Sequence, residues 1–333
     1  MRILIATPFY PPKAGVLATY AAGFEAAFRK QGHHVDVVSF GSVASLPPGI
    51  RHLAYLFMLL ARMPHASLAI GLDHWSVGMP AFVAAKLFGV PIALRIGGDF
   101  LWESYVGRTK ESVLLSEFYD TLRDFSLKER MISRSMRMLI RNADALLFTT
   151  RFQKGIWEKA YRFDAARAHI IENFYPSRAG SAQPTRSRVF VHAGREIFLK
   201  NSALLHRAFE RVKASHPDIG LDERALPHAE HQARVQDSYA VIVASLSEVS
   251  SNAAIDAVSL GVPFVCTKDT GTSERLEGCG LFVDTRSEDA LARAIESLLE
   301  PETYAKLRKN IDAFSYVHSW DDIAHEIVTS VSK

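Results

Sequence analysis

The sequence predicts an α/β protein built from two units, each a parallel sheet covered by helices on both faces. Short runs of β-branched residues alternate with longer helical patterns from the first residues onward. The alternation stops after Pro176 at a run of small and polar residues, and then begins again. Ligands of such folds bind beyond the carboxyl ends of the strands, so we expect a site in a cleft between two facing units.

The expected elements follow from the period of the apolar residues and from the Gly and Pro residues that bound them. In the first half, strands are expected at 2–7, 35–40, 67–71, 91–96 and 145–148, and helices at 17–30, 51–62 and 78–88. In the second half, strands are expected at 189–193, 218–221, 240–244, 263–267 and 281–283, and helices at 202–215, 230–237, 252–260, 288–299, 304–313 and 321–331. These elements predict domains at 1–176 and 188–316, a linker at 177–187 and a last helical segment at 317–333.

The composition of the chain argues against a membrane-spanning helix, a metal site at the cysteines and a nucleic-acid partner. No uncharged apolar run reaches the roughly 20 residues that a membrane-spanning helix needs. Cys266 and Cys279 lie in apolar or glycine-rich surroundings, which favours reduced thiols in a cytoplasmic protein, and no His or acid at a fixed spacing suggests a metal site with them. Residues 1–187 hold 23 Lys and Arg against 14 Asp and Glu, and residues 188–333 hold 16 against 22. A basic first half suits an anionic surface, and no nucleic-acid partner is expected.

Two carboxylates mark the stretch SLSEVSSNAAIDAVSLGVPFV, residues 245–265. Ser251 or Asn252 is expected to cap a helix that follows a buried strand, which places backbone N–H groups and the positive end of the helix dipole at the sheet edge. Glu248 precedes this helix and Asp256 lies about one turn into it. Such a pair suits the vicinal hydroxyls of a sugar or ribose. The alternative is that the two acids only favour the helix dipole and face solvent, and these residues alone leave both open.

A second pattern is VFVHAGREIFLKN, residues 189–201, in which a strand ends at Gly194 and a loop carries Arg195 and Lys200. A guanidinium and an ammonium at one strand end can neutralise a diphosphate, although an isolated pair of surface cations is the alternative. Gly15 lies in the loop after the first strand and allows close backbone approach to a ligand. The loop is not a Gly-x-Gly-x-x-Gly dinucleotide fingerprint.

Five motifs follow one another along the chain: Tyr10-Pro-Pro-Lys-Ala-Gly, Gly32-His-His-Val, Glu172-Asn173, Gly194-Arg195 with Lys200, and Ser247-Glu248 with Asp256 and Gly261-Val-Pro. Together they resemble the retaining glycosyltransferase family 4, of the GT-B fold. The resemblance covers nearly the whole chain. It implies a GT-B fold of two Rossmann-like domains, with the acceptor on the first domain and the nucleotide sugar on the second. It also implies that the last helix packs back on the first domain.

The resemblance also implies roles for single residues. Arg195 and Lys200 would hold the donor diphosphate, Glu248 would contact the donor sugar, and Asp256 would take the place of the Glu that contacts the ribose. Asp256 is one methylene shorter than that Glu, and Val249–Asn252 replace the usual Gly-Phe-Gly. Helix-start amides at Ser251 and Asn252 would still serve the diphosphate. The second half is also shorter than usual between residues 213 and 240.

In the first half, strand 91–96 ends at Gly97-Gly98, where members of the family often carry a His that is absent here. Asp99 is the nearest polar candidate to contact the donor sugar or the acceptor, with Glu103 and His74 behind it. His74 is interpreted as a structural histidine. Residues 128–141 place Arg130, Arg134, Arg137 and Arg141 on one helical face. This face could rest on an anionic membrane, on its cytoplasmic side, or be an ordinary exposed basic face.

The hypothesis from the sequence is a metal-independent, retaining glycosyltransferase that needs no cofactor. It would move a sugar from a UDP- or GDP-sugar to a hydroxyl of a glycan or lipid-linked glycan, as part of polysaccharide biosynthesis. Two alternatives remain: a nucleotide-sugar epimerase of the same architecture, and a degenerate transferase that serves as a non-enzymatic partner in glycan assembly.

Overall fold

The computed structural model describes residues 1–13, 15–47, 49–178, 188–192, 197–226 and 228–331. The chain forms two compact units, and neither is contiguous in sequence. Unit 1 contains Met1–Leu101, Arg123–Phe174 and His318–Lys333, and unit 2 contains Trp102–Leu122 and Tyr175–Val317. Nine residues of the expected linker, 179–187, lie outside the described residues. Within the described part of the chain, none of the helices has the length and apolar character required to span a membrane.

Unit 1 is built on a parallel sheet of six strands in the order β2-β1-β3-β4-β5-β6. The strands are β1 (Arg2–Thr7), β2 (His34–Ser39), β3 (Leu68–Gly71), β4 (Ile92–Ile96), β5 (Ala145–Phe148) and β6 (Ala168–Ile170). The helices are α1 (Val16–Lys30), α2 (Ile50–Arg62), α3 (Gly78–Phe88), α5 (Leu127–Asn142), α6 (Arg151–Tyr161) and α13 (Trp320–Val331). Helix α4 (Phe100–Thr109) begins in unit 1 and ends in unit 2.

Unit 2 is built on a parallel sheet of five strands in the order β11-β10-β9-β7-β8. The strands are β7 (Arg188–His192), β8 (Ile219–Asp222), β9 (Ala240–Val243), β10 (Phe264–Thr267) and β11 (Gly280–Val283). The helices are α7 (Ser202–Ser215), α8 (His228–Gln236), α9 (Asn252–Ser259), α10 (Ser273–Leu276), α11 (Glu288–Leu299) and α12 (Pro301–Ala313). Between residues 213 and 240 the described chain adds one strand and one helix, as the sequence predicted.

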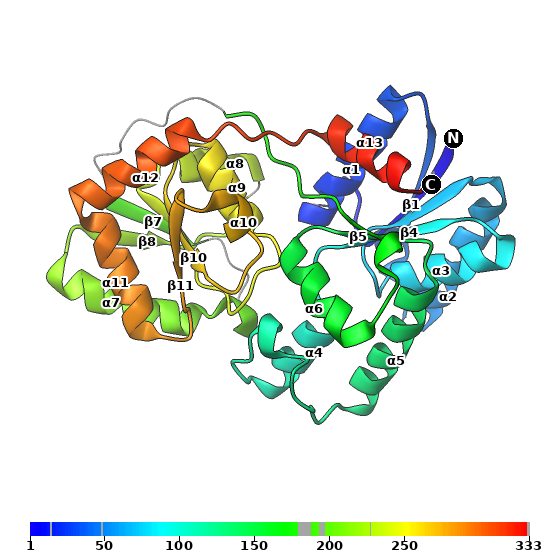
Figure 1. Cartoon of the computed structure of the whole chain (residues 1–333), viewed down its shortest axis with the longest axis horizontal. Coiled ribbons are helices and arrows are strands. Elements are labelled where there is room, and N and C mark those ends of the chain that lie inside the picture. The colour runs from blue at the N-terminus through cyan, green and yellow to red at the C-terminus, as the bar shows by residue number, and fades with distance from the viewer. Residues whose placement is uncertain (14, 48, 179–187, 193–196, 227, 332–333) are drawn as a thin grey trace. The chain divides into compact units, whose positions relative to one another are not determined.

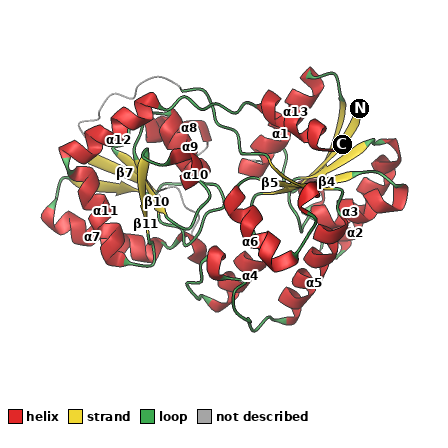
Figure 2. Cartoon of the chain, viewed as in Figure 1, coloured by secondary structure: helices red, strands yellow, loops and turns green. Residues whose placement is uncertain are grey.

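The predicted two-unit α/β architecture with parallel sheets is confirmed (Figure 2). Each sheet is sandwiched by helices because its strands are apolar on both faces, and all four residues of β3, β5, β9 and β10 are buried. In unit 2, one apolar cluster joins the sheet to α9 and another joins it to α7 and α11. The sequence patterns did not predict α4, α6, α10 or β6.

The end of the chain completes the core of unit 1. Helix α13, red in Figure 1, packs beside α1, which is blue. The Trp320 ring lies against Tyr20, Phe24 and Phe174, and it is stacked on Phe174 at 4.5 Å between ring centroids. A Cβ atom at Gly23 would lie 2.6 Å from the indole, so glycine is needed at this point of α1 for the ring to fit.

Candidate functional site

The order of the strands in unit 2 creates a topological switch point between β7 and β9. The chain leaves β7 for the edge strand β8 and then returns to β9 on the other side of β7. The connections after β7 and β9 therefore run in opposite directions from the carboxyl ends of these two strands. Ligands of open α/β sheets bind in the crevice at such a point. Lys200 follows β7 and Glu248 follows β9, so two of the predicted residues lie at this point.

Lys200 and Glu248 are in direct contact there. Lys200 ends the short 3-10 helix Phe198–Lys200, and its Nζ donates to Glu248 Oε1 at 2.5 Å. The backbone N–H of Leu246 donates to the carbonyl of Leu199 at 2.9 Å, which ties the loop after β9 to the loop after β7. The two charged side chains are 25% and 17% exposed, so the ion pair is largely shielded but still reaches solvent.

The surroundings of Glu248 hold its carboxylate in one orientation. Ser245 Oγ donates to Oε1 at 2.6 Å, and the Glu248 backbone N–H donates to the carbonyl of Asp269 at 3.0 Å. Thr285 Oγ1 donates to the Ser245 carbonyl at 2.8 Å and secures the start of the same loop. Oε2 of Glu248 receives no hydrogen bond from the described residues. One oxygen of the carboxylate is therefore committed to the protein, and the other can accept hydroxyls from a ligand.

The loop after β9 leads into α9 with the cap that the sequence predicted. Ser251 is the N-cap, and its hydroxyl accepts from the Ala254 N–H at 3.3 Å. The Ser251 N–H donates to Thr272 Oγ1 at 2.7 Å, so this amide is engaged within the protein. Asn252 opens the helix, and Asp256 lies one turn along it, partly exposed. Their contacts with a diphosphate and a ribose stay predictions.

Four further residues were predicted for the site. Gly194 and Arg195 lie outside the described residues. Gly15 and Asp99 belong to unit 1. Gly15 caps α1 with φ 135°, a backbone conformation that favours glycine, and open space surrounds its Cβ position. Asp99 is 1% exposed and its Oδ2 accepts from the Trp157 indole at 2.8 Å, so its carboxylate is held inside the unit rather than presented at its surface.

Two buried histidines lie beside predicted site residues. His74 Nε2 accepts from the Phe100 N–H at 3.2 Å, and burial lowers its pKa although Asp73 and Asp99 oppose this. This neutral, hydrogen-bonded imidazole is consistent with a structural role. His192, at the end of β7, is 2% exposed and its Nδ1 bonds the Ile242 carbonyl at 2.9 Å, while burial lowers its pKa. Its Nε2 has no partner in the described part of the chain, which leaves an acceptor at the switch point.

Sequence reasoning missed a segment that packs on the loops beside Glu248. Residues 110–119, here called the strap, belong to unit 2 although they lie between β4 and β5 in sequence. The Leu115 N–H donates to Ser247 Oγ at 2.8 Å, and Ser247 in turn donates to the buried carboxylate of Asp269. Leu115 and Phe118 are each 1% exposed. The apolar residues of the strap indicate that it is buried, but nothing in the local sequence indicates which residues it contacts.

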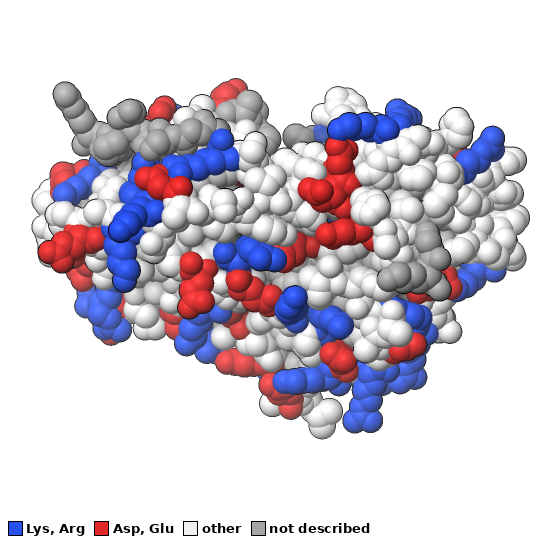
Figure 3. Space-filling view, turned by 45° about the horizontal axis from the view of Figure 1, so that its top comes forward, with Lys and Arg blue, Asp and Glu red and all other residues white. Residues whose placement is uncertain are grey.

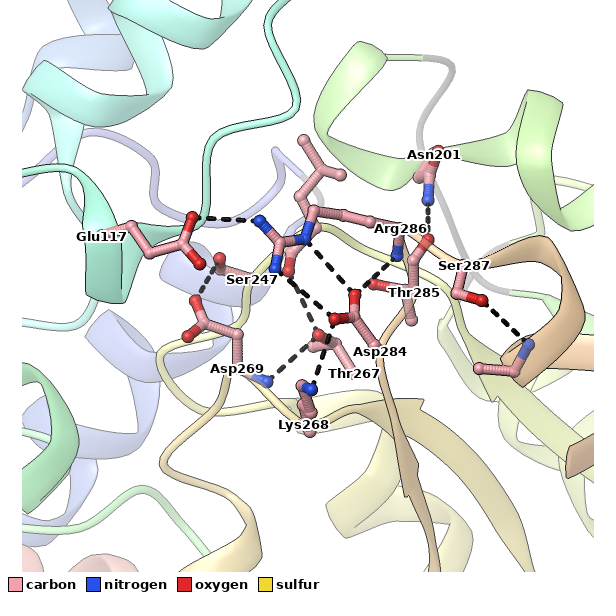
Figure 4. Close-up of polar contacts among 12 residues, drawn as sticks. Glu117, Asn201, Ser247, Thr267, Lys268, Asp269, Asp284, Thr285, Arg286 and Ser287 are labelled. Atoms are coloured by element: carbon pink, nitrogen blue, oxygen red, sulfur yellow. Dashed lines mark hydrogen bonds and ion pairs between the residues drawn. The ribbon is translucent and has the colours of Figure 1, made fainter.

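Charged residues extend this contact along the edge of the sheet, as Figure 4 shows. Arg286, in the loop after β11, bonds Glu117 of the strap at 3.0 Å and Asp284 at 3.3 Å. Lys268, after β10, bonds Asp284 at 3.3 Å. Hydrogen bonding to Arg286 and Lys268 lowers the pKa of Asp284 against the opposing effect of its burial. The loops after β9, β10 and β11 thus form one polar edge, with the strap joined to it.

A switch point with a paired cation and carboxylate can bind an anionic ligand that also carries hydroxyls, and a phosphorylated sugar has both. Residues 224–301 match the sequence model of the family described as Glycosyl transferases group 1. This segment is a glycosyl transferases group 1 domain. It includes the loop with Glu248, helix α9 and the strands β9 to β11. No curated protein matches the sequence.

Solved structures share the fold over nearly the full length of this chain. Sucrose-phosphate synthase from Thermosynechococcus elongatus is similar with a TM-score of 0.73 at 15% identity, over 98% of this chain and 97% of that one. HepE from Anabaena, in complex with UDP-glucose, gives 0.71 at 14% identity, over 100% and 99%. A putative UDP-N-acetylglucosamine 2-epimerase from Listeria monocytogenes gives 0.60 at 14% identity, over 98% and 94%. The predicted GT-B fold, superfamily and enzyme class, glycosyltransferase, are confirmed, and membership of family 4 stays a prediction.

Proposed function

We propose that this protein is a retaining glycosyltransferase that moves a sugar from a UDP- or GDP-sugar to a hydroxyl of a glycan or lipid-linked glycan. The observation that carries the proposal is the contact between Lys200 and Glu248 at the switch point of a group 1 domain. The HepE structure that shares the fold holds UDP-glucose, which favours UDP as the nucleotide.

Lys200 would stabilise the leaving group. As the bond from the sugar to the diphosphate breaks, negative charge grows on the diphosphate oxygens, and an ammonium already fixed beside them needs no reorganisation. Glu248 fixes Lys200 in this position through the contact at 2.5 Å. Arg195, the third residue after β7 in the sequence, would add a guanidinium to the same diphosphate. Two side-chain cations would then take the role that a metal ion has in other transferases, so we propose transfer without a metal.

Glu248 would hold the donor sugar through Oε2, which accepts hydroxyl donors without breaking the bonds of Oε1. The acceptor hydroxyl would attack the anomeric carbon from the side of the leaving group, with retention of configuration. Its proton would pass to the leaving diphosphate oxygen, so the new C–O bond, the broken C–O bond and the proton balance without a protein base. Asp256 would contact the ribose. Because its side chain is one methylene shorter than that of Glu, a water molecule would bridge the remaining distance.

The decisive experiment is a calorimetric titration of the protein with UDP, GDP and ADP, followed by the same titrations of Lys200→Ala. We expect one nucleotide to bind in the micromolar range and the variant to bind it about 10- to 100-fold more weakly, because the diphosphate loses a charge-assisted hydrogen bond. Lys268→Ala is the matched control, since Lys268 lies on the same edge, is 57% exposed and pairs with Asp284. Its affinity should stay that of the unmodified protein.

The two alternatives give different results. A non-enzymatic partner in glycan assembly would bind none of the three nucleotides, and this outcome would remove the proposal. An epimerase would bind the nucleotide and convert the donor sugar with no acceptor present, which analysis of the sugar after incubation with the donor alone detects. Activity that survives EDTA treatment supports the metal-free mechanism, and loss that added Mg²⁺ or Mn²⁺ restores would contradict it.

A further inference from the structure

Helix α5 presents an arginine band to solvent. Arg130, Arg134, Arg137 and Arg141 recur at intervals of three and four residues, and all four are exposed. The helix carries five Lys or Arg and one acid, and that acid, Glu129, is 1% exposed and bonds the Ser126 N–H in a capping box. Figure 3 shows Lys and Arg side chains close together at the lower right of the view, with some acids among them. The exposed side of α5 thus carries positive charge without acids of its own to balance it.

The arginine band is not used for internal ion pairs. Arg130 Nε donates to the Phe125 carbonyl at 2.8 Å, while Arg134, Arg137 and Arg141 form no ion pair with the described residues. The band borders a groove of about 620 Å³. Its lining residues are Phe125, Arg130, Ser133, Arg134, Arg137, Met138, Arg141 and Asn142. Because no carboxylate lines this groove, an anion entering it meets only cationic, polar and apolar groups.

An apolar band lies next to the arginines on the same helix. Leu127, Met131 and Met138 are 80%, 64% and 44% exposed. At 100° per residue these three side chains fall within about 40° of one another, directly beside the arginine band. The opposite face of α5 is occupied, since Ile132, Met136, Leu139 and Ile140 are fully buried. The helix therefore has no freedom to rotate and hide the three apolar side chains inside unit 1.

These two bands together distinguish between kinds of anionic partner. A soluble phosphate or nucleotide would use the arginines but gain nothing from the exposed apolar side chains. A membrane surface uses both, because apolar side chains enter the boundary of the acyl chains while long arginines reach the headgroup phosphates. We propose that α5 is a membrane-docking helix that binds the headgroups of anionic phospholipids. The proposal goes beyond the sugar transfer proposed above and does not depend on it.

The test is co-sedimentation of the full chain with vesicles of phosphatidylcholine alone or with about 30 mol % phosphatidylglycerol. We expect binding to the anionic vesicles that weakens as salt rises, and much weaker binding to the neutral ones. The variant R134Q/R137Q/R141Q should bind the anionic vesicles at least about tenfold more weakly, because each basic residue near the surface adds to the attraction. L127S/M131S should bind at low salt but detach at a lower salt concentration than the unmodified protein.

The matched control is K213Q/K306Q/K309Q, which removes the same charge from exposed positions on α7 and α12 of unit 2. It should bind within about twofold of the unmodified protein, since these residues lie outside the proposed surface. All the substituted side chains are exposed, and thermal unfolding followed by circular dichroism checks that each variant is folded. Equal loss in the control and the α5 variant, equal binding to neutral vesicles, or no binding to either vesicle would overturn the proposal. Binding of inorganic phosphate by α5 without binding of vesicles would equally overturn it.

Discussion

Ser247 is the side chain whose removal should release the strap from the loops of unit 2. Its hydroxyl accepts from the Leu115 N–H at 2.8 Å and donates to Asp269. Ser247→Ala removes both bonds at once without adding volume. The Leu115 N–H would then be buried with no acceptor, because Leu115 is 1% exposed, and the 6% exposed carboxylate of Asp269 would lose a donor.

The magnitude follows from these two losses. A buried donor left unsatisfied costs about 1–3 kcal/mol, and loss of a hydrogen bond to a charged group adds to it, while water that reaches the opened edge offsets part of the sum. We expect the free energy of local opening to fall by about 2–3 kcal/mol, which is about 30- to 140-fold in the opening equilibrium. The fold of unit 2 should persist, because the apolar clusters around its sheet are untouched.

Hydrogen exchange followed by mass spectrometry measures this opening directly. Peptides from residues 112–118 should exchange about 30- to 140-fold faster in Ser247→Ala, while peptides from α7 should not change. Thr285→Val is the matched control, since it removes one buried hydroxyl of the same polar edge that bonds Ser245 rather than the strap. If strap exchange rises less than about threefold, or rises equally in α7 and in the control, the hydroxyl does not hold the strap.

Three further predictions concern stability. Gly280→Ala should lower the free energy of unfolding by about 1–3 kcal/mol in urea titrations, because the new methyl would lie 2.5 Å from the Phe264 ring, and a smaller side chain at 264 should restore part of it. Arg224 lowers the pKa of Asp222 to about 2 in the folded protein. The carboxylate therefore stabilises the fold at pH values above the pKa that it has in the unfolded chain, and this contribution disappears as pH falls from about 4 to 2. Asp222→Asn should therefore flatten the loss of stability in that acidic range, and an unchanged slope would contradict this. Arg95→Met should cost about 3 kcal/mol or more in thermal or urea unfolding, since its guanidinium donates to the carbonyls of Ile171 and Glu172 after β6, and a loss below about 1 kcal/mol would refute that role.

Much of the fold was predictable because it depends on local pattern. Runs such as AVIV after Tyr239 are apolar on both faces and predict a buried parallel strand, and β9 is observed at Ala240–Val243. Ser251 or Asn252 was predicted as the N-cap because these polar residues directly precede an apolar helical period, and the capping bond is made by Ser251. Glu248 and Lys200 were linked by resemblance to a family, and their 2.5 Å contact depends on β7 and β9 being neighbours.

Features set by distant contacts were not predictable. Asp99 was predicted as a contact to the donor sugar or the acceptor because it follows a strand end, and its hydrogen bond with the Trp157 indole, 58 residues further along the chain, has no signal in the local sequence. The strap has no helical or strand period, and its position depends on Ser247 and Asp269, more than 130 residues away. A single sequence carries no signal for such pairs, because each partner alone looks like an ordinary polar residue.

The position of α13 has a consequence for how the protein acquires its structure during synthesis. Unit 1 needs Trp320 beside Gly23, and yet all of unit 2 is translated between these two residues. The first sheet can assemble on the ribosome only with an apolar face of α1 uncovered, while unit 2 can complete its core earlier. The half of the chain that is made first is thus the half that finishes folding last, and until then α1 is a surface on which a chaperone could act.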